Sequence, residues 1–161
     1  MVNYKEIYNN WQKDPKTFWK EQSDNIHWER KPTKILDDDN KPFYKWYPDG
    51  SLNTCFNAID RHVINGRGEQ DAILYDSPVT NTKKKITYSE LKYQVSIFAG
   101  ALKKLGVLKG DRVIIYMPMI PEALVAMLAC SRLGAIHSVV FGGFASNELA
   151  VRIDDCKPKI I

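Results

Sequence analysis

The chain has 161 residues, of which 44% are hydrophobic and 26% charged, and its 23 lysines and arginines against 19 aspartates and glutamates give a net charge of +4. This composition is typical of a globular protein with a sizeable core, and its apolar fraction excludes disorder over most of the chain. The weak positive charge suits an anionic ligand but falls short of the basic surface of a nucleic-acid-binding protein. Cys55, Cys130 and Cys156 are widely spaced, which predicts neither a disulfide framework nor a zinc site. We therefore expect a reducing, cytoplasmic location.

No segment has the pattern of a leader or a membrane span. Residues 1–19 lack the apolar core of a signal peptide. The most apolar stretch, Val113–Cys130, is interrupted by Pro118, Pro121 and Glu122, so neither half approaches the roughly 20 apolar residues that cross a bilayer. We expect a soluble protein without a membrane partner.

The first 46 residues differ in character from the rest. They hold all four tryptophans among lysines, acids, asparagines and prolines, without aliphatic runs. We predict that this segment packs onto another surface through its aromatic side chains. Stacking on single-stranded nucleic acid is the alternative. The acidic triplet Asp37–Asp39 would repel phosphate, so we expect no nucleic-acid partner and a solvated loop at the triplet.

Regular patterns begin near Leu52. Apolar residues at helical spacing predict a short helix over Asn53–Ile64. A strand over Ala72–Tyr75 follows, and then a polar turn that carries Lys83–Lys85. We interpret these lysines as part of a solvated hairpin loop, with a phosphate-binding patch as the alternative.

The next helix has the strongest local signals in the chain. Thr87 and Glu90 have the spacing of a capping box, in which each side chain bonds the backbone of the other residue. Apolar residues recur at helical spacing from Leu91 to Leu105, and Gly106 supplies a stop.

Alternating strands and helices fill the remainder. Strands are predicted at Arg112–Tyr116, at His137–Phe141 (buried on both faces) and from Lys159 onward. Between them we predict a helix over Pro121–Leu133 and a second one capped by Ser146. This order predicts an α/β fold with a parallel sheet and right-handed βαβ crossovers.

Two loops follow the carboxyl ends of the predicted strands, where α/β proteins bind their ligands. They are Met117–Pro121 and Gly142–Ser146. Adjacent glycines allow either a positive φ or a close approach to the backbone, so Gly142 and Gly143 indicate a ligand channel or simply a tight turn. The sequence contains neither a P-loop nor a GxGxxG motif, and its histidines lack metal-ligand spacing. It therefore predicts no complete catalytic site and no metal site within these residues.

One long segment resembles a known family. GDRVIIYMPMIPEALVAMLACSRLGAIHSVVFGGFAS (Gly110–Ser146), together with Asn53–His62 and Thr87–Leu91, resembles the acetyl- and propionyl-CoA synthetases of the adenylate-forming superfamily. Phe144–Ser146 and Arg152–Lys159 are similar to the propionyl-CoA synthetase branch, with acetate–CoA ligase as the alternative.

The resemblance implies a fold, an activity and a set of ligands. Residues 1–70 would be the aromatic amino-terminal extension, and residues 71–161 the start of the AMP-binding domain. The activity would be ligation of a small carboxylate to coenzyme A in two steps, through an acyl-adenylate formed from Mg²⁺-ATP. Phe141, Gly142, Gly143 and Phe144 would line the tunnel for the pantetheine arm of coenzyme A.

The family's phosphate loop, ribose-binding aspartate, acyl pocket and adenylation lysine have no counterpart in these residues. The chain also stops at Ile160-Ile161, inside a predicted apolar strand. We therefore expect it to be the amino-terminal part of a longer ligase, inactive alone and partnered by the rest of its polypeptide. A free-standing nucleotide-binding or regulatory module is the alternative.

Overall fold

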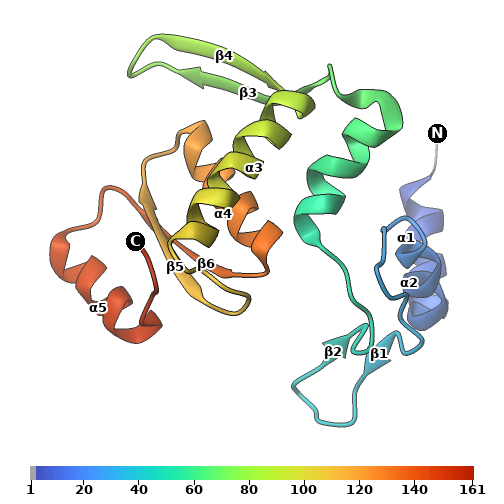
Figure 1. The fold of residues 1–161 in the computed structure, drawn as a ribbon. Helices are drawn as coiled ribbons and strands as arrows, with labels where there is room; N and C mark the ends of the chain where they lie inside the picture. Colours follow the sequence, from blue (N-terminus) through green and yellow to red (C-terminus); the bar gives the residue numbers. More distant parts are fainter. Residues whose placement is uncertain (1–2) are drawn as a thin grey trace. The chain divides into compact units, whose positions relative to one another are not determined.

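The computed structural model describes residues 3–161, which form two compact units divided between Asn53 and Thr54 (Figure 1). The amino-terminal unit contains two helices and a two-stranded antiparallel sheet, namely α1 (Tyr4–Lys13), α2 (Pro15–Ser23), β1 (Leu36–Asp37) and β2 (Lys45–Trp46). The sequence predicted no regular elements here because the helices are short and lack an aliphatic face.

Side-chain caps define the two helices of the amino-terminal unit. The Asn3 carboxamide oxygen accepts a hydrogen bond from the amide of Lys5 at the start of α1. The Asp14 carboxylate accepts one from the amide of Thr17 at 3.1 Å, and Pro15 occupies the first turn of α2. Both caps use unpaired amides of a first helical turn, and proline is favoured there because it has no amide hydrogen.

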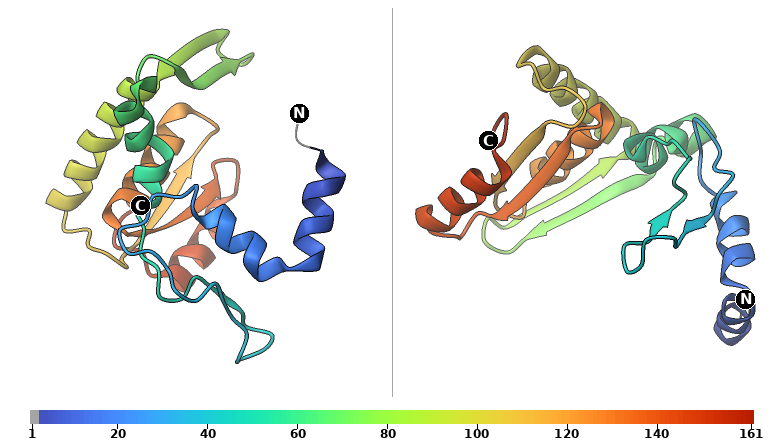
Figure 2. Two further views of the ribbon diagram at one scale, coloured as in Figure 1. Left: turned by 90° about the vertical axis from the view of Figure 1, so that its right-hand side faces the viewer. Right: turned by 90° about the horizontal axis from the view of Figure 1, so that it is seen from below.

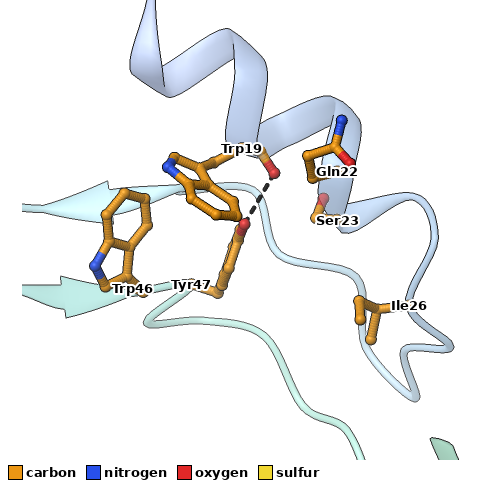
Figure 3. A pocket seen from close by; sticks show the side chains of 6 residues that line it. All are labelled: Trp19, Gln22, Ser23, Ile26, Trp46 and Tyr47. Carbon is orange, nitrogen blue, oxygen red and sulfur yellow. Dashed lines mark hydrogen bonds between the residues drawn. The ribbon is translucent and has the colours of Figure 1, made fainter. Parts of the chain in front are cut away.

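Aromatic rings hold the amino-terminal unit together. Trp19 meets Trp46 edge to face at 5.8 Å between ring centroids, and Trp28 lies 5.3 Å from Tyr47. The Tyr47 hydroxyl donates to the backbone oxygen of Trp19 at 2.8 Å (Figure 3). These contacts lie within the unit, so the predicted packing of its aromatic side chains onto another surface stays a prediction.

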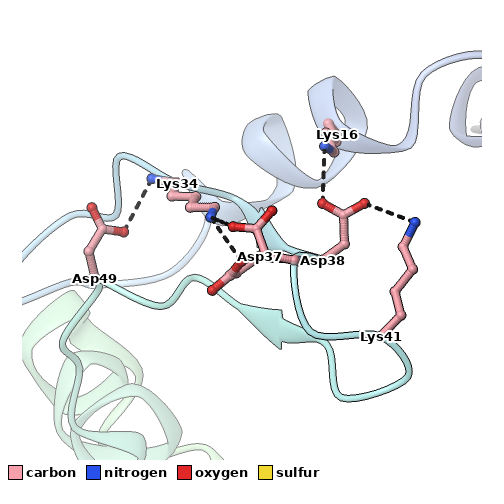
Figure 4. A network of polar contacts seen from close by, with 7 residues as sticks. Lys16, Lys34, Asp37, Asp38, Lys41 and Asp49 are labelled. Carbon is pink, nitrogen blue, oxygen red and sulfur yellow. Dashed lines mark hydrogen bonds and ion pairs between the residues drawn. The ribbon is translucent and has the colours of Figure 1, made fainter.

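The acidic triplet Asp37–Asp39 is paired rather than simply solvated. Lys16, Lys34 and Lys41 approach its carboxylates with N–O distances of 2.9 to 3.9 Å (Figure 4). Asp37 also belongs to β1, so the predicted loop is wrong at its first residue. The lysines are distributed along the chain and only the folded backbone brings them to the acids.

The carboxy-terminal unit carries the α/β fold (Figures 1 and 2). Its elements are the π-helices η1 (Phe56–Asp60) and η2 (Val63–Arg67), β3 (Asp71–Ser77), β4 (Thr82–Thr87), α3 (Tyr88–Lys104), β5 (Arg112–Met117), α4 (Pro121–Leu133), β6 (Ile136–Phe141) and α5 (Ser146–Cys156). The helix predicted over Asn53–Ile64 is present as η1 and η2, which continue to Arg67. Gly66 there has the left-handed φ of 77° that glycine adopts most easily.

The lysine run lies in a strand and not in the hairpin loop. Strand β4 pairs with β3 in antiparallel register, and Lys83–Lys85 lie within it. The Lys83 ammonium pairs with Asp76 at 3.0 Å, and the Lys85 ammonium with Asp71 at 2.7 Å. Cross-strand pairs of opposite charge stabilise a hairpin, which explains how a lysine run is accommodated in a strand.

The predicted βαβ unit is confirmed. Strands β5 and β6 are parallel, in register from Arg112 opposite Ile136 to Met117 opposite Phe141, and α4 connects them. Helix α4 packs against α3 and against both strands (Figure 2). On the other side of β5, the amide of Ile114 donates to the oxygen of Ile160 at 3.0 Å, as expected for the start of a third parallel strand.

The main core lies between α3, α4, η1 and β5. The side chains that are almost completely buried there are Cys55, Ile59, Ile86, Val95, Val107, Ala129 and Cys130. The Asp60 carboxylate in η1 forms a bidentate ion pair with the Arg132 guanidinium of α4, with N–O distances of 2.7 and 3.2 Å. This pair links η1 to α4 in the core.

Strand β6 is not buried on both faces, contrary to the prediction. Val140 is 1% exposed, whereas Val139 and Phe141 are 51% and 58% exposed. Successive side chains of a strand point to opposite faces, and only the face that carries Val140 packs against the core. The run of apolar residues correctly predicted a strand, but it does not predict whether other elements cover both faces of that strand.

Helix α5 begins one residue earlier than predicted. Ala145 is its N-cap and makes no side-chain hydrogen bond, and Ser146 is the first helical residue. Across residues 3–161, the structure has no helix with the length and hydropathy that a bilayer span requires.

Candidate functional site

The two predicted ligand loops lie together at the carboxyl end of the parallel strands. Met117 ends β5 opposite Phe141, which ends β6. At Gly142, an added Cβ would lie 3.0 Å from the carbonyl carbon of Met117 and 3.1 Å from the nitrogen of Pro118. The backbones of the two loops are therefore in direct contact, and glycine at 142 is what allows this approach.

At Gly143 the close approach is to a side chain and not to the backbone. An added Cβ there would lie 2.6 Å from Cε1 of the Phe141 ring. Neither Gly142 nor Gly143 is among the glycines with positive φ, so the backbone conformation of this turn does not by itself demand glycine. Close approach, and not a left-handed turn, explains both residues.

Phe141 and Phe144 form an aromatic pair around the two glycines. Their rings are perpendicular, with centroids 5.9 Å apart, an arrangement favoured by the ring quadrupoles. The amide of Phe144 donates to the oxygen of Phe141 at 3.1 Å, which closes the turn between them. Both side chains remain accessible, at 58% and 40% exposure. The structure thus brings the four predicted site residues into one surface.

Two further residues hold Phe144, and the sequence analysis did not identify them. The hydroxyl of Tyr116, in β5, donates to the backbone oxygen of Phe144 at 2.8 Å. The guanidinium carbon of Arg152, in α5, lies 4.7 Å from the centroid of the Phe144 ring. Neither contact could be predicted from residue spacing along the chain, because the tertiary fold brings β5 and α5 to Phe144.

The site is suited to binding and not to proton transfer. Phe141–Phe144 carry no ionisable side chain, and the charges beside them belong to Arg152 and its ion-pair partner Glu148. Within residues 3–161 no three histidine, cysteine or acidic side chains cluster closely enough to hold a metal ion. The four residues form an exposed surface of backbone and aromatic rings.

The buried thiols offer no alternative nucleophile. Cys55 and Cys130 are fully buried, and burial raises the pKa of both thiols above the ordinary value. The thiolate is the reactive form of cysteine, so both residues are unreactive in the folded chain. They are packing residues of the main core.

A second concave feature lies wholly within the amino-terminal unit. This aromatic pocket has a volume of about 420 Å³ and is lined by Trp19, Gln22, Ser23, Ile26, Trp46 and Tyr47 (Figure 3). Tyr47 has a φ of 49°, which is uncommon outside glycine, and it lines the pocket together with its neighbour Trp46. The clustering of tryptophans in the sequence was the only signal for it.

Comparison with known families covers both units. Residues 61–161 match the family described as "AMP-binding enzyme", and residues 4–58 match "Acetyl-coenzyme A synthetase N-terminus". The first match includes β5, β6 and the loops that carry the candidate site.

Individual proteins agree with the family matches. The chain is 57% identical over 148 residues to "Acyl-CoA synthetase short-chain family member 3, mitochondrial" of Bos taurus, which covers 92% of the chain. It is 49% identical over 156 residues, 97% of the chain, to "Acetyl-coenzyme A synthetase" of Streptomyces coelicolor. Among solved structures, acetoacetyl-CoA synthetase from Streptomyces lividans superposes with a TM-score of 0.83 at 29% identity over 92% of the chain.

The chain spans only part of the length of these proteins. It covers 22% of the Bos taurus protein, 24% of the Streptomyces coelicolor protein and 23% of the Streptomyces lividans chain. The name of the Bos taurus protein places that protein in mitochondria, and a cytoplasmic location for this chain stays a prediction.

Proposed function

The chain belongs to the AMP-binding enzyme family, in its acetyl-CoA-synthetase-like group, and on this premise we propose that the whole protein is a short-chain acyl-CoA synthetase. It would join a small carboxylate to coenzyme A with ATP, forming an acyl-adenylate and pyrophosphate first and acyl-CoA and AMP second. The residues described here would act together with further polypeptide that carries the reacting groups. The identity of 57% over the segment that contains both site loops supports this proposal most strongly.

Within this reaction, Phe141, Gly142, Gly143 and Phe144 would line the passage for the pantetheine arm of coenzyme A. Two observations support this role: the two rings are exposed and perpendicular to each other, and the turn between them lies against the backbone of Met117 and Pro118 at Gly142. A thiol delivered through a fixed passage reacts as if at high local concentration, so rigidity here would favour the second step. ATP and Mg²⁺ would be bound outside the residues described.

Propionate is the acyl substrate that we propose first. The resemblance of Phe144–Ser146 and Arg152–Lys159 to the propionyl-CoA synthetase branch supports it. Acetate is the second candidate, because an acetyl-coenzyme A synthetase is 49% identical over nearly the whole chain.

For the domain organisation, we propose that residues 1–70 form the extension and residues 71–161 the beginning of the AMP-binding domain. The compact units divide earlier, between Asn53 and Thr54, and the family matches meet between residues 58 and 61. The extension as proposed would then include η1 and η2, which pack on α3.

The test is ATP–pyrophosphate exchange by the whole protein purified from its source, with its intact mass measured in parallel. We expect a mass several-fold above the 18.5 kDa of this chain, and exchange that depends on a short carboxylate, with a higher kcat/KM for propionate than for acetate. The reverse order would favour acetate–CoA ligase. No exchange with acetate, propionate or butyrate would contradict the ligase.

A glycine variant tests the coenzyme A passage separately. Gly143→Val adds a branched side chain whose Cβ would start 2.6 Å from the Phe141 ring. We expect acyl-CoA formation to fall while pyrophosphate exchange, which does not use coenzyme A, is retained. Gly100→Ala in α3, where an added Cβ meets nothing within 4 Å, is the matched control. Equal loss of both half-reactions in Gly143→Val would argue against the passage.

A further inference from the structure

The guanidinium of Arg152 lies over the aromatic ring of Phe144. The guanidinium carbon lies 4.7 Å from the ring centroid, within the roughly 6 Å over which a cation is attracted to the face of a ring. Arg152 lies in the middle of α5, eight positions after Phe144, so the helix must fold back over the turn to make this contact.

Glu148 fixes the direction of the Arg152 side chain. The Nη1 group of Arg152 donates to the Glu148 backbone oxygen at 2.7 Å and to its carboxylate Oε2 at 2.9 Å. The two residues are four positions apart, one turn of α5, with the acid on the amino-terminal side, which is the favourable order. Both side chains are substantially exposed, so this pair adds little stability and its effect is mainly orientation.

The other sides of Phe144 are also held. Its ring meets Phe141 at right angles, and its backbone oxygen accepts from the Tyr116 hydroxyl at 2.8 Å. The Phe144 ring thus lies between the Phe141 ring and the Arg152 guanidinium, while 40% of the residue stays exposed. A ring held in this way presents a constant surface to a ligand.

We propose that Arg152 is a positioning residue for coenzyme A, acting through the Phe144 ring and oriented by Glu148. This inference rests on the proposed function, because it assumes that Phe144 lines the coenzyme A passage. The guanidinium would not need to touch coenzyme A. Its role would be to keep the Phe144 ring in the rotamer that leaves the passage open. Coenzyme A would then bind without the free-energy cost of ordering this side chain.

The test is a double-mutant cycle on the whole enzyme, with KM for coenzyme A and pyrophosphate exchange measured for each variant. Arg152→Met keeps the apolar stem and removes the charge. We expect KM for coenzyme A to rise about two- to fivefold, in line with the loss of one cation–π contact at an exposed site, with pyrophosphate exchange unchanged. Arg152→Lys, which keeps a cation, should recover part of the loss. Arg67→Met, on η2, is the control for removing an arginine elsewhere in the same unit.

Phe144→Leu distinguishes the explanations. If Arg152 acts through the ring, Arg152→Met has no further effect in the Phe144→Leu background. An undiminished effect of Arg152→Met in that background would overturn the proposal and indicate direct contact with coenzyme A. If Phe144→Leu alters KM for coenzyme A but Arg152→Met does not, only the positioning role fails. If neither Phe144→Leu nor Gly143→Val alters it, the coenzyme A passage itself is wrong.

Discussion

Among the glycines described in the carboxy-terminal unit, Gly142 is the one whose added Cβ would meet main-chain atoms. The added Cβ of any other residue would meet main-chain atoms of Met117 and Pro118 and not the flexible end of a side chain. Main-chain atoms cannot move without displacing the end of β5, so the whole strand–loop junction would shift. The same junction carries the proposed coenzyme A passage.

Gly142→Ala should therefore destabilise the fold, by about 1–3 kcal/mol as for other overpacked sites. Gly100→Ala should do the opposite. Gly100 lies within α3 with nothing within 4 Å of an added Cβ, and alanine is favoured over glycine in a helix by about 0.5–1 kcal/mol. Urea unfolding of both variants measures the difference, and an equal change in the two would show that the contact with Met117 is not limiting.

Asp49 is a second residue whose surroundings determine its chemistry. Its carboxylate accepts hydrogen bonds from the Thr33 hydroxyl at 2.5 Å, the Thr33 amide at 2.9 Å and the Lys34 amide at 3.2 Å. These bonds, that of the Thr33 side chain first, lower the pKa of Asp49 from 3.8 to about 2. The bonds also tie the segment before β1 to the turn after β2.

Because the folded pKa of Asp49 is below its unfolded value, its contribution to stability is present above about pH 4 and is lost as the pH falls toward 2. Asp49→Asn should remove this contribution, so that the unfolding free energy falls less steeply between pH 5 and pH 2 than in the wild type. Denaturant titrations at a series of pH values measure it. Asp155→Asn, in α5, controls for the loss of a surface carboxylate, and parallel wild-type and Asp49→Asn curves would refute the prediction.

Helix α3 shows how local signals act at the scale of an element. The Thr87 hydroxyl accepts from the Glu90 amide at 3.2 Å, and the Glu90 carboxylate accepts from the Thr87 amide at 2.8 Å. This reciprocal cap starts the helix directly after β4, whose last residue is Thr87. One residue thus ends a strand and caps the helix that follows it.

Thr87→Ala should lower the unfolding free energy by about 1 kcal/mol, the usual cost of a lost N-cap. Thr87→Ser keeps the hydroxyl and should lose much less. Thermal unfolding followed by circular dichroism compares the two variants. The cap is not important for stability if Ala and Ser at position 87 give the same melting temperature.

At the scale of the whole molecule, burial separates the three cysteines. Cys55 and Cys130 lie in the core that joins η1, α3 and α4, whereas Cys156 at the end of α5 is only partly covered. Access of a reagent to the two buried thiols therefore requires the core itself to open.

Iodoacetamide should modify Cys156 in the native protein long before Cys55 or Cys130, because both burial and a raised pKa suppress their thiolates. Peptide mass spectrometry after pulses of labelling in increasing urea would follow each site. We expect Cys55 and Cys130 to become reactive together at the unfolding transition. Labelling of Cys55 well below that transition would mean that η1 detaches from the core before the rest unfolds.

The sequence by itself determined the elements whose signals are local. The capping box located α3, the apolar runs located β5 and β6, and Pro121 and Gly134 bounded α4, so the parallel βαβ unit was predictable. The same reasoning placed the paired glycines at the carboxyl end of the sheet, because parallel strands end at one edge.

Only the tertiary structure decided the burial, ion pairs and side-chain contacts of residues whose partners lie far away in the sequence. It placed Lys83–Lys85 in a strand, where two of them pair with acids of the neighbouring strand, and it left one face of β6 exposed although the residues are apolar. It also gave the reason for glycine at 142, and it brought Arg152 onto the Phe144 ring. Hydrophobic periodicity and caps act over a few residues along the chain, whereas these contacts join segments that only folding brings together.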